Sequence, residues 1–197
     1  MSFMGELVEV HAGRAMSGPL GGGVMGLERL LRPPAEGRAF SARPVTLEAL
    51  EELQALMAVG PGMTGASPTQ LLFIATPSAK ARLAQRLAPR TRDTAVLSPV
   101  CAVIGYDRQF AEQIIAFCGD GVGGESGFDR PGALRAAAMR NSVLQGAYLA
   151  LSARALGLEA VFLHGFDGAA VAGEFFGDPA MSAIFVAGLG YPAQPNA

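Results

Sequence analysis

Hydrophobic positions between Pro131 and Leu158 recur every three or four residues, which predicts a long helix that organises the chain. Pro131 suits a first helical turn, and Gly157 suits a left-handed end. The main apolar stripe consists of Leu144, Ala147 or Tyr148, Leu151, Ala155 and Leu158. Because the opposite side is also largely apolar, we expect this helix to be covered by more than one layer or by a second subunit.

Shorter patterns predict the other elements of one α+β domain. Thr46 is a good N-cap for a helix that Gly60 ends, and Ser78 is a candidate cap for the next helix, which extends to Leu87. Further helices are expected at 25–31, 108–117 and 169–176, and strands at 71–75, at 100–106 together with Val96, at 160–163 and at 183–189. Helices and about four strands mix without strict alternation, which favours α+β over a doubly wound sheet.

The N-terminal segment differs from the rest of the chain. Residues 1–24 include the glycine-rich run that begins at Gly18, which resists regular structure, so they are predicted to form a flexible arm. Residues 25–197 show no internal repeat and no domain boundary. They are long enough for a single domain with its own hydrophobic core.

Composition narrows the possible functions. Half of the 197 residues are hydrophobic and only 16% are charged, which favours surface hidden between two copies of the chain. The net charge of −2 argues against nucleic-acid binding, because few cations are available to neutralise phosphates. Apolar runs are too short to span a membrane, and two cysteines are too few for a disulfide framework. We therefore expect a cytoplasmic homodimer that binds no membrane.

Few residues suggest chemistry directly. Gly119–Gly124 matches a dinucleotide-binding fingerprint but lacks the strand and helix that the fingerprint requires, so it is interpreted as a surface loop. With only two histidines, a metal site is not expected. His164 and Asp167 are three residues apart at the end of a strand. They could form an acid/base pair, or they could cap and pack locally. No catalytic residue is assigned.

Several motifs together resemble one known family. They are Arg140-Asn-Ser-Val-Leu-Gln-Gly-Ala-Tyr-Leu, Ala153-Arg-Ala-Leu-Gly-Leu, Gly165-Phe-Asp, Glu174-Phe-Phe and Gly188-Leu-Gly-Tyr. This set is similar to the FMN-dependent nitroreductases, and most similar to the branch that includes malonic semialdehyde reductase. The resemblance covers residues 25–191. It implies an antiparallel sheet flanked by helices, a homodimer with long interface helices, and two FMN molecules between the subunits. It also implies hydride transfer from NAD(P)H through FMN to a small acceptor.

The positions that would contact FMN depart from the family pattern. Ala35 and Gly37 stand where the family has a phosphate-binding arginine and a polar residue, so the resemblance points to Arg32 or Arg38 as substitutes. The flavin ring would then lie against Gly62, Met63 and Gly65. The family's Gly-Pro-Met-Ser-Gly, whose backbone reaches the reactive nitrogen of the flavin, is replaced by a run from Val161. The predicted contacts in that run are Phe162, Leu163, His164 and Gly165.

These departures leave two interpretations open. In the first, the protein is an NAD(P)H oxidoreductase that holds FMN in an altered site. In the second, the fold has lost FMN and serves as a binding or structural dimer, because a phosphate without an arginine is costly to desolvate. Bulky Phe162 and Leu163 could fill the space of the flavin ring in that case.

Overall fold

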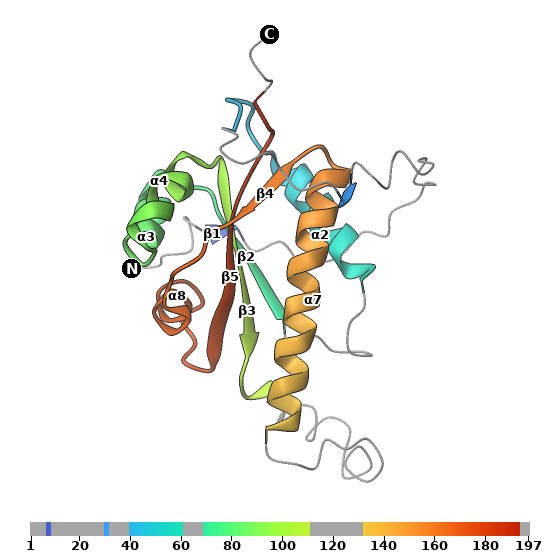
Figure 1. Ribbon diagram of the computed structural model, residues 1–197, viewed down its shortest axis with the longest axis vertical. Coiled ribbons are helices and arrows are strands. Elements are labelled where there is room, and N and C mark those ends of the chain that lie inside the picture. Colours follow the sequence, from blue (N-terminus) through green and yellow to red (C-terminus); the bar gives the residue numbers. More distant parts are fainter. Residues whose placement is uncertain (1–6, 9–29, 32–39, 61–68, 111–131, 194–197) are drawn as a thin grey trace.

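The computed structural model describes residues 7–8, 30–31, 40–60, 69–110 and 132–193, which form a five-stranded sheet with helices on both faces (Figure 1). The strands are β1 (Leu7–Val8), β2 (Thr69–Ile74), β3 (Val100–Asp107), β4 (Glu159–Phe162) and β5 (Met181–Gly190). Their order across the sheet is β1-β2-β3-β5-β4, and each neighbouring pair is antiparallel. An antiparallel sheet packed against helices confirms the α+β class.

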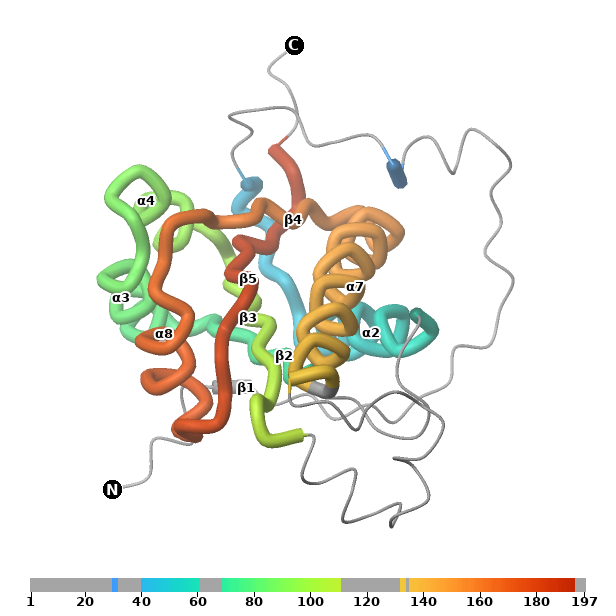
Figure 2. The backbone as a smooth tube through the Cα atoms, turned by 60° about the horizontal axis from the view of Figure 1, so that its bottom comes forward, coloured from blue at the N-terminus to red at the C-terminus, as the bar shows by residue number. Residues whose placement is uncertain are grey.

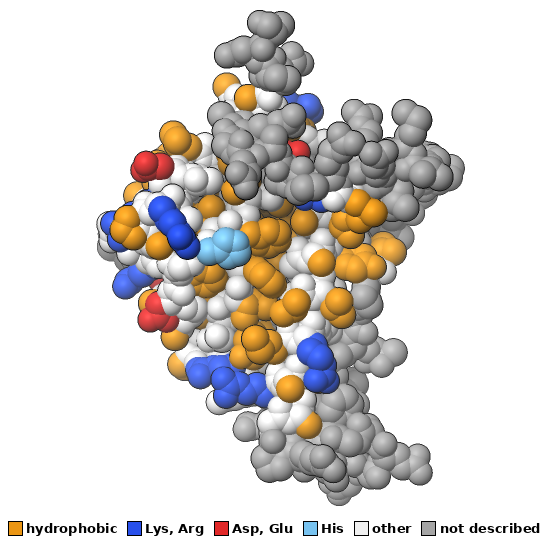
Figure 3. All heavy atoms as spheres, viewed as in Figure 1, with side chains coloured by type: hydrophobic (Ala, Val, Ile, Leu, Met, Phe, Trp, Pro, Cys, Tyr) orange, Lys and Arg blue, Asp and Glu red, His pale blue; other side chains and the backbone are white. Residues whose placement is uncertain are grey.

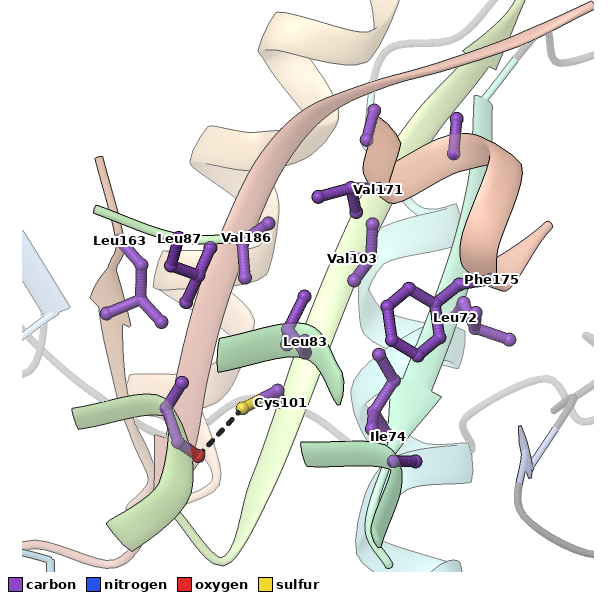
Figure 4. Packing of buried hydrophobic residues seen from close by; sticks show 14 of the residues in the cluster. Leu72, Ile74, Leu83, Leu87, Cys101, Val103, Leu163, Val171, Phe175 and Val186 are labelled. Atoms are coloured by element: carbon purple, nitrogen blue, oxygen red, sulfur yellow. Dashed lines mark hydrogen bonds between the residues drawn. The ribbon is translucent and has the colours of Figure 1, made fainter. Parts of the chain in front are cut away.

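The helices form two layers, one on each face of the sheet (Figure 2). One layer holds α2 (Leu47–Ala58) and α7 (Ala133–Ala155), and the other holds α3 (Pro77–Gln85), α4 (Pro89–Leu97) and α8 (Gly168–Phe175). Successive strand residues point to opposite faces, so the central strands supply both cores. The core under α7 includes Leu53, Phe73, Ile104, Leu149 and Leu189. The core under α8 includes Ile74, Leu83, Val103, Val171 and Val186 (Figure 4).

Helix α7 is the predicted long helix, but it buries a different face from the predicted one. It starts at Ala133 after Gly132, and it ends before Gly157, whose φ of +74° confirms the left-handed stop. The buried residues along it include Ala138, Ser142, Gly146, Leu149 and Ala153. Of the predicted stripe, Leu144, Ala147 and Ala155 are exposed, Tyr148 and Leu151 are half-buried, and Leu158, beyond the end of the helix, is buried. Because the helix is apolar on almost every side, its sequence periodicity could not show which side faces the sheet.

Two local predictions were wrong, and one was confirmed. Helix α2 starts as predicted, with the Thr46 hydroxyl accepting a hydrogen bond from the Ala49 amide at 3.3 Å. The cap of α3 is Thr76, not Ser78, and Val96 lies in α4 rather than in a strand. Helix α4 escaped prediction because Ala95 is its only buried residue, so it has no apolar stripe to detect.

Several predicted segments lie outside the described residues. These are the loop at 119–124, most of the helices at 25–31 and 108–117, and the N-terminal arm apart from Leu7 and Val8, which pair with β2 as β1. The division into an arm and a single domain therefore stays a prediction. In the described part of the chain, no helix is both long and apolar enough to cross a membrane.

The thiol of Cys101 gives the fold a predictable response to pH. Cys101 is fully buried and donates a hydrogen bond to the Ala95 carbonyl at 3.3 Å (Figure 4). Burial raises its pKa from 9.0 to about 12, although the nearby charge of Lys80 opposes part of that rise. The unfolded thiol loses its proton near pH 9 while the folded thiol keeps it. Folding stability from this group is therefore complete below pH 9 and falls as the pH rises towards 12.

We therefore expect urea unfolding at pH 10 to give a free energy of unfolding about 1 kcal/mol lower than at pH 8 from this group alone. The variant Cys101→Ala should lose less stability over the same interval. Equal pH slopes for the two proteins would show that the Cys101 thiol does not control this response.

Candidate functional site

The candidate site is the turn that connects β4 to α8. Phe162 is the last residue of β4, and Asp167 is the N-cap of α8, so residues 163–166 form a short connection. The side chain of Phe162 packs towards the α7 layer, whereas Leu163 is 2% exposed and lies in the opposite core. This alternation follows from the strand geometry. It leaves the backbone of this turn, rather than the Leu163 side chain, available for contacts.

The carbonyl groups of this turn point towards α4. The Ala88 amide donates to the Gly165 carbonyl at 2.7 Å, and the Thr91 hydroxyl lies 3.5 Å from the His164 carbonyl oxygen. In a trans peptide the C=O and the following N–H point in opposite directions. The amide of Gly165 therefore points away from α4, and so does the amide of Phe166. The turn thus presents backbone donors on the side remote from α4.

Gly165 allows this arrangement in two ways. Its φ is +79°, a conformation that residues with a side chain rarely adopt. A Cβ atom added to it would lie 2.9 Å from the Cβ of Ala88. Glycine at this position therefore permits both the backbone turn and its close approach to the start of α4.

An apolar surface lies beside the turn, between the histidine and α7 (Figure 3). The ring of Phe162 contacts that of Phe185 edge-to-face, with 5.3 Å between the centroids, and both rings are partly exposed. Gly146 of α7 accommodates Phe185, because a Cβ there would lie 2.6 Å from the ring. A register shift between Ile104 and Gly105 lets β5 direct two successive residues, Ile184 and Phe185, towards the α7 core.

His164 and Asp167 do not form a pair in the structure. One carboxylate oxygen of Asp167 accepts hydrogen bonds from the Ala169 amide at 2.9 Å and the Ala170 amide at 3.1 Å, so it caps α8. The side chain of His164 is exposed, and no hydrogen bond or ion pair joins it to Asp167 within the described residues. Of the two interpretations, acid/base pair or local cap, the structure supports the local cap for Asp167. The described residues also contain no cluster suited to a metal ion.

The nine predicted cofactor contacts divide into two groups. Phe162, Leu163, His164 and Gly165 lie together at the end of β4. The other five lie outside the described residues: Arg32, Arg38, Gly62, Met63 and Gly65. The assignment of all nine to a cofactor site stays a prediction, with Leu163 contributing only its backbone.

Sequence reasoning missed the role of the first turn of α4. Ala88 and Thr91 contact the β4–α8 turn from a helix that had not been predicted. Pro89 at the first helical position was the available signal, since proline is favoured there. The contacts of Ala88 and Thr91 with residues more than 70 positions away could not be predicted from the sequence.

Comparison with known proteins decides the family. A protein of Stenotrophomonas maltophilia that carries the name NADH dehydrogenase/NAD(P)H nitroreductase is 38% identical over 166 residues, which cover 84% of each chain. A protein of the same name from a Caulobacter species is 34% identical over 168 residues, covering 85% of this chain and 86% of its own. This chain belongs to the nitroreductase family. No protein-family model matches it.

Solved structures show the nitroreductase fold. A nitroreductase-named protein from Bacillus subtilis superposes with a TM-score of 0.69 at 20% identity, covering 89% of this chain and 94% of its own. A Staphylococcus epidermidis protein named as an NAD(P)H:FMN oxidoreductase superposes with a TM-score of 0.70 at 16% identity, covering 94% and 92%. At these identities the likeness concerns the fold alone. It confirms the nitroreductase-like architecture that the sequence motifs predicted.

Proposed function

We propose that this nitroreductase-family chain is an NAD(P)H oxidoreductase that binds FMN in an altered site between two copies of the chain. The β4–α8 turn is the observation that carries the proposal, because it directs the amide of Gly165 away from α4 and lies beside an apolar surface. The names of the relatives and of one fold neighbour support the same chemistry.

The described residues fit the flavin ring. A flavin ring has apolar faces and a polar edge, so its site needs an apolar wall and a few well-placed hydrogen-bond donors. The Phe162–Phe185 pair supplies apolar surface, and the amides of Gly165 and Phe166 supply donors. Bound FMN would take a hydride from NAD(P)H and pass it to a small acceptor, and this chain would bind and orient it. The side chain of His164 is exposed beside this turn, and we assign it to contact with the acceptor.

The phosphate of FMN is assigned to Arg32 and Arg38, as the resemblance implies. A charge-assisted hydrogen bond to phosphate contributes about 1.5–3 kcal/mol. We expect Arg38→Ala to weaken FMN binding at least tenfold, measured by the change in flavin fluorescence on titration. Arg90→Ala, which removes an arginine exposed on α4, is the control and should bind FMN like the wild type. Unchanged affinity in Arg38→Ala would remove Arg38 from the site.

Helix α7 is assigned to the interface between the two copies. Met139, Val143, Leu144 and Ala147 of α7 are exposed, although three of them are large and apolar. No charged residue occurs from Asn141 to Ala153, and the next charge is Arg154 in the last turn of the helix. A second copy covering this face would remove the apolar side chains from water. It would also account for the low charge of the chain.

A flavin-free dimer is the second candidate, and one observation favours it. Phe162 and Phe185 already contact each other on the face of the sheet where the flavin ring would lie. If neither ring moves aside, they fill part of that space. The buried position of Leu163 removes that residue from this alternative, because its side chain faces the other core.

The absorbance of the purified protein separates the two candidates. The oxidoreductase should be yellow, should release one FMN per chain on denaturation, and should oxidise NADH or NADPH when a quinone or nitro compound is added. A colourless protein that takes up neither FMN nor FAD on dialysis would exclude the oxidoreductase and support the flavin-free dimer. Flavin uptake without NAD(P)H oxidation would support the cofactor site and exclude the redox activity.

A further inference from the structure

The β4–α8 turn is held by the first turn of α4 and by the two residues that precede it. The Ala88 amide donates to the Gly165 carbonyl at 2.7 Å, and Leu87 pairs with Phe166 as an antiparallel bridge. The Thr91 hydroxyl donates its one proton to the Ala88 carbonyl oxygen at 3.0 Å and shares it, more weakly, with the His164 carbonyl oxygen at 3.5 Å. Thr91 is therefore the one described side chain that joins the start of α4 to the peptide between His164 and Gly165.

The position of Thr91 gives its hydroxyl an effect beyond helix stability. A donor placed at a carbonyl oxygen polarises that peptide and strengthens the N–H on its other side as a donor. Here the carbonyl belongs to His164, and the N–H belongs to Gly165, which points away from α4. The hydroxyl also limits rotation of the peptide plane next to Gly165, which has no side chain to restrict its backbone.

We propose that Thr91 is a positioning residue, which orients and polarises the His164–Gly165 peptide towards the reactive edge of the bound flavin. The effect on the flavin rests on the proposed function. The contact between Thr91 and the His164 carbonyl is present without a flavin. Because Thr91 acts through the backbone, it would not touch the cofactor, and its contribution would appear as a change in the strength of a backbone donor.

The test compares three variants of the full-length protein. Thr91→Val removes the hydroxyl and keeps the shape, Thr91→Ser restores a hydroxyl, and Thr94→Val makes the same change elsewhere in α4. The amide of Gly165 shares its peptide with the His164 carbonyl, so its NMR resonance reports on the hydrogen bond at that oxygen. We expect this resonance to shift in flavin-free Thr91→Val, and to stay near its wild-type position in Thr91→Ser and Thr94→Val.

With FMN bound, Thr91→Val should raise the dissociation constant about fivefold, because the Gly165 amide, no longer oriented by Thr91, would lose about one hydrogen bond's contribution to flavin binding. The midpoint potential of the flavin should also change in Thr91→Val, whereas Thr91→Ser and Thr94→Val should keep wild-type values. A purely structural role for Thr91 would lower thermal stability without changing the potential.

An unshifted Gly165 resonance in Thr91→Val would overturn the inference, and so would equal effects of Thr91→Val and Thr94→Val on FMN affinity. Failure of the proposed function is distinct, because the wild-type protein would then bind no FMN at all. In that case the NMR comparison alone would decide whether Thr91 orients the peptide.

Discussion

Replacing Val143 with glutamate is expected to convert the proposed dimer into monomers. Val143 is 45% exposed on the face of α7 that we assign to the partner copy. A two-fold interface would bury two uncompensated carboxylates, one from each copy. Each buried charge costs several kcal/mol, so the dissociation constant of the dimer should rise at least a hundredfold. Analytical ultracentrifugation over a micromolar concentration series would measure this change.

Val96→Glu is the matched control for that experiment. Val96 is 46% exposed and also lies on a helix, but on the opposite face of the sheet in α4. Its replacement should leave the dimer intact. If Val143→Glu remained a dimer of wild-type affinity, α7 would not form the interface. If both variants became monomers, the effect would not be specific to α7. Because FMN is proposed to lie between the copies, Val143→Glu should also release the flavin.

Replacing Gly165 with alanine is expected to produce the largest loss of FMN affinity among changes in the β4–α8 turn. Alanine is strained at a φ of +79°, at a cost of roughly 1–2 kcal/mol. Its Cβ would also lie 2.9 Å from that of Ala88, so the turn must move away from α4. We expect FMN binding to weaken at least tenfold, because the displaced amide no longer points at the flavin edge. Calorimetric titration with FMN would measure the change.

Two comparison variants separate strain from displacement. Gly157 has a similar φ of +74°, but an added Cβ there meets nothing within 4 Å. Gly157→Ala should therefore lower stability by a similar amount and leave FMN affinity unchanged. Combining Gly165→Ala with Ala88→Gly removes the second Cβ and should recover part of the lost affinity. If the double variant bound FMN no better than Gly165→Ala, contact with Ala88 would not position the turn.

The sequence predicted the elements whose local signals agree with their tertiary surroundings. Thr46 and Gly157 mark the ends of helices in the structure, as their residue types suggested. The apolar runs of β3 and β5 were recognised because both faces of those strands are buried. The family motifs succeeded for a related reason. They contain residues whose packing demands are narrow, such as Gly146 beneath Phe185.

Prediction failed where local signals were absent or were equally strong on several sides. Helix α4 has one buried residue, so its sequence shows no hydrophobic periodicity that would predict a helix. Helix α7 is apolar on almost all sides, so its periodicity favoured a stripe in which the fold leaves Leu144, Ala147 and Ala155 exposed. The small residues Ser142, Gly146 and Ala153 allow the close approach that decides which side is buried.

By itself, the amino-acid sequence determined the α+β class and the family, because these depend on local residue types in a fixed order, whereas the place of the candidate site at the end of β4 stays a prediction. Only the tertiary structure decided which backbone groups that site can present to a ligand. It brought Ala88 and Thr91 against His164 and Gly165, across more than 70 residues of chain. The direction of an amide depends on which partner holds the neighbouring carbonyl, and that partner is chosen by packing between distant segments.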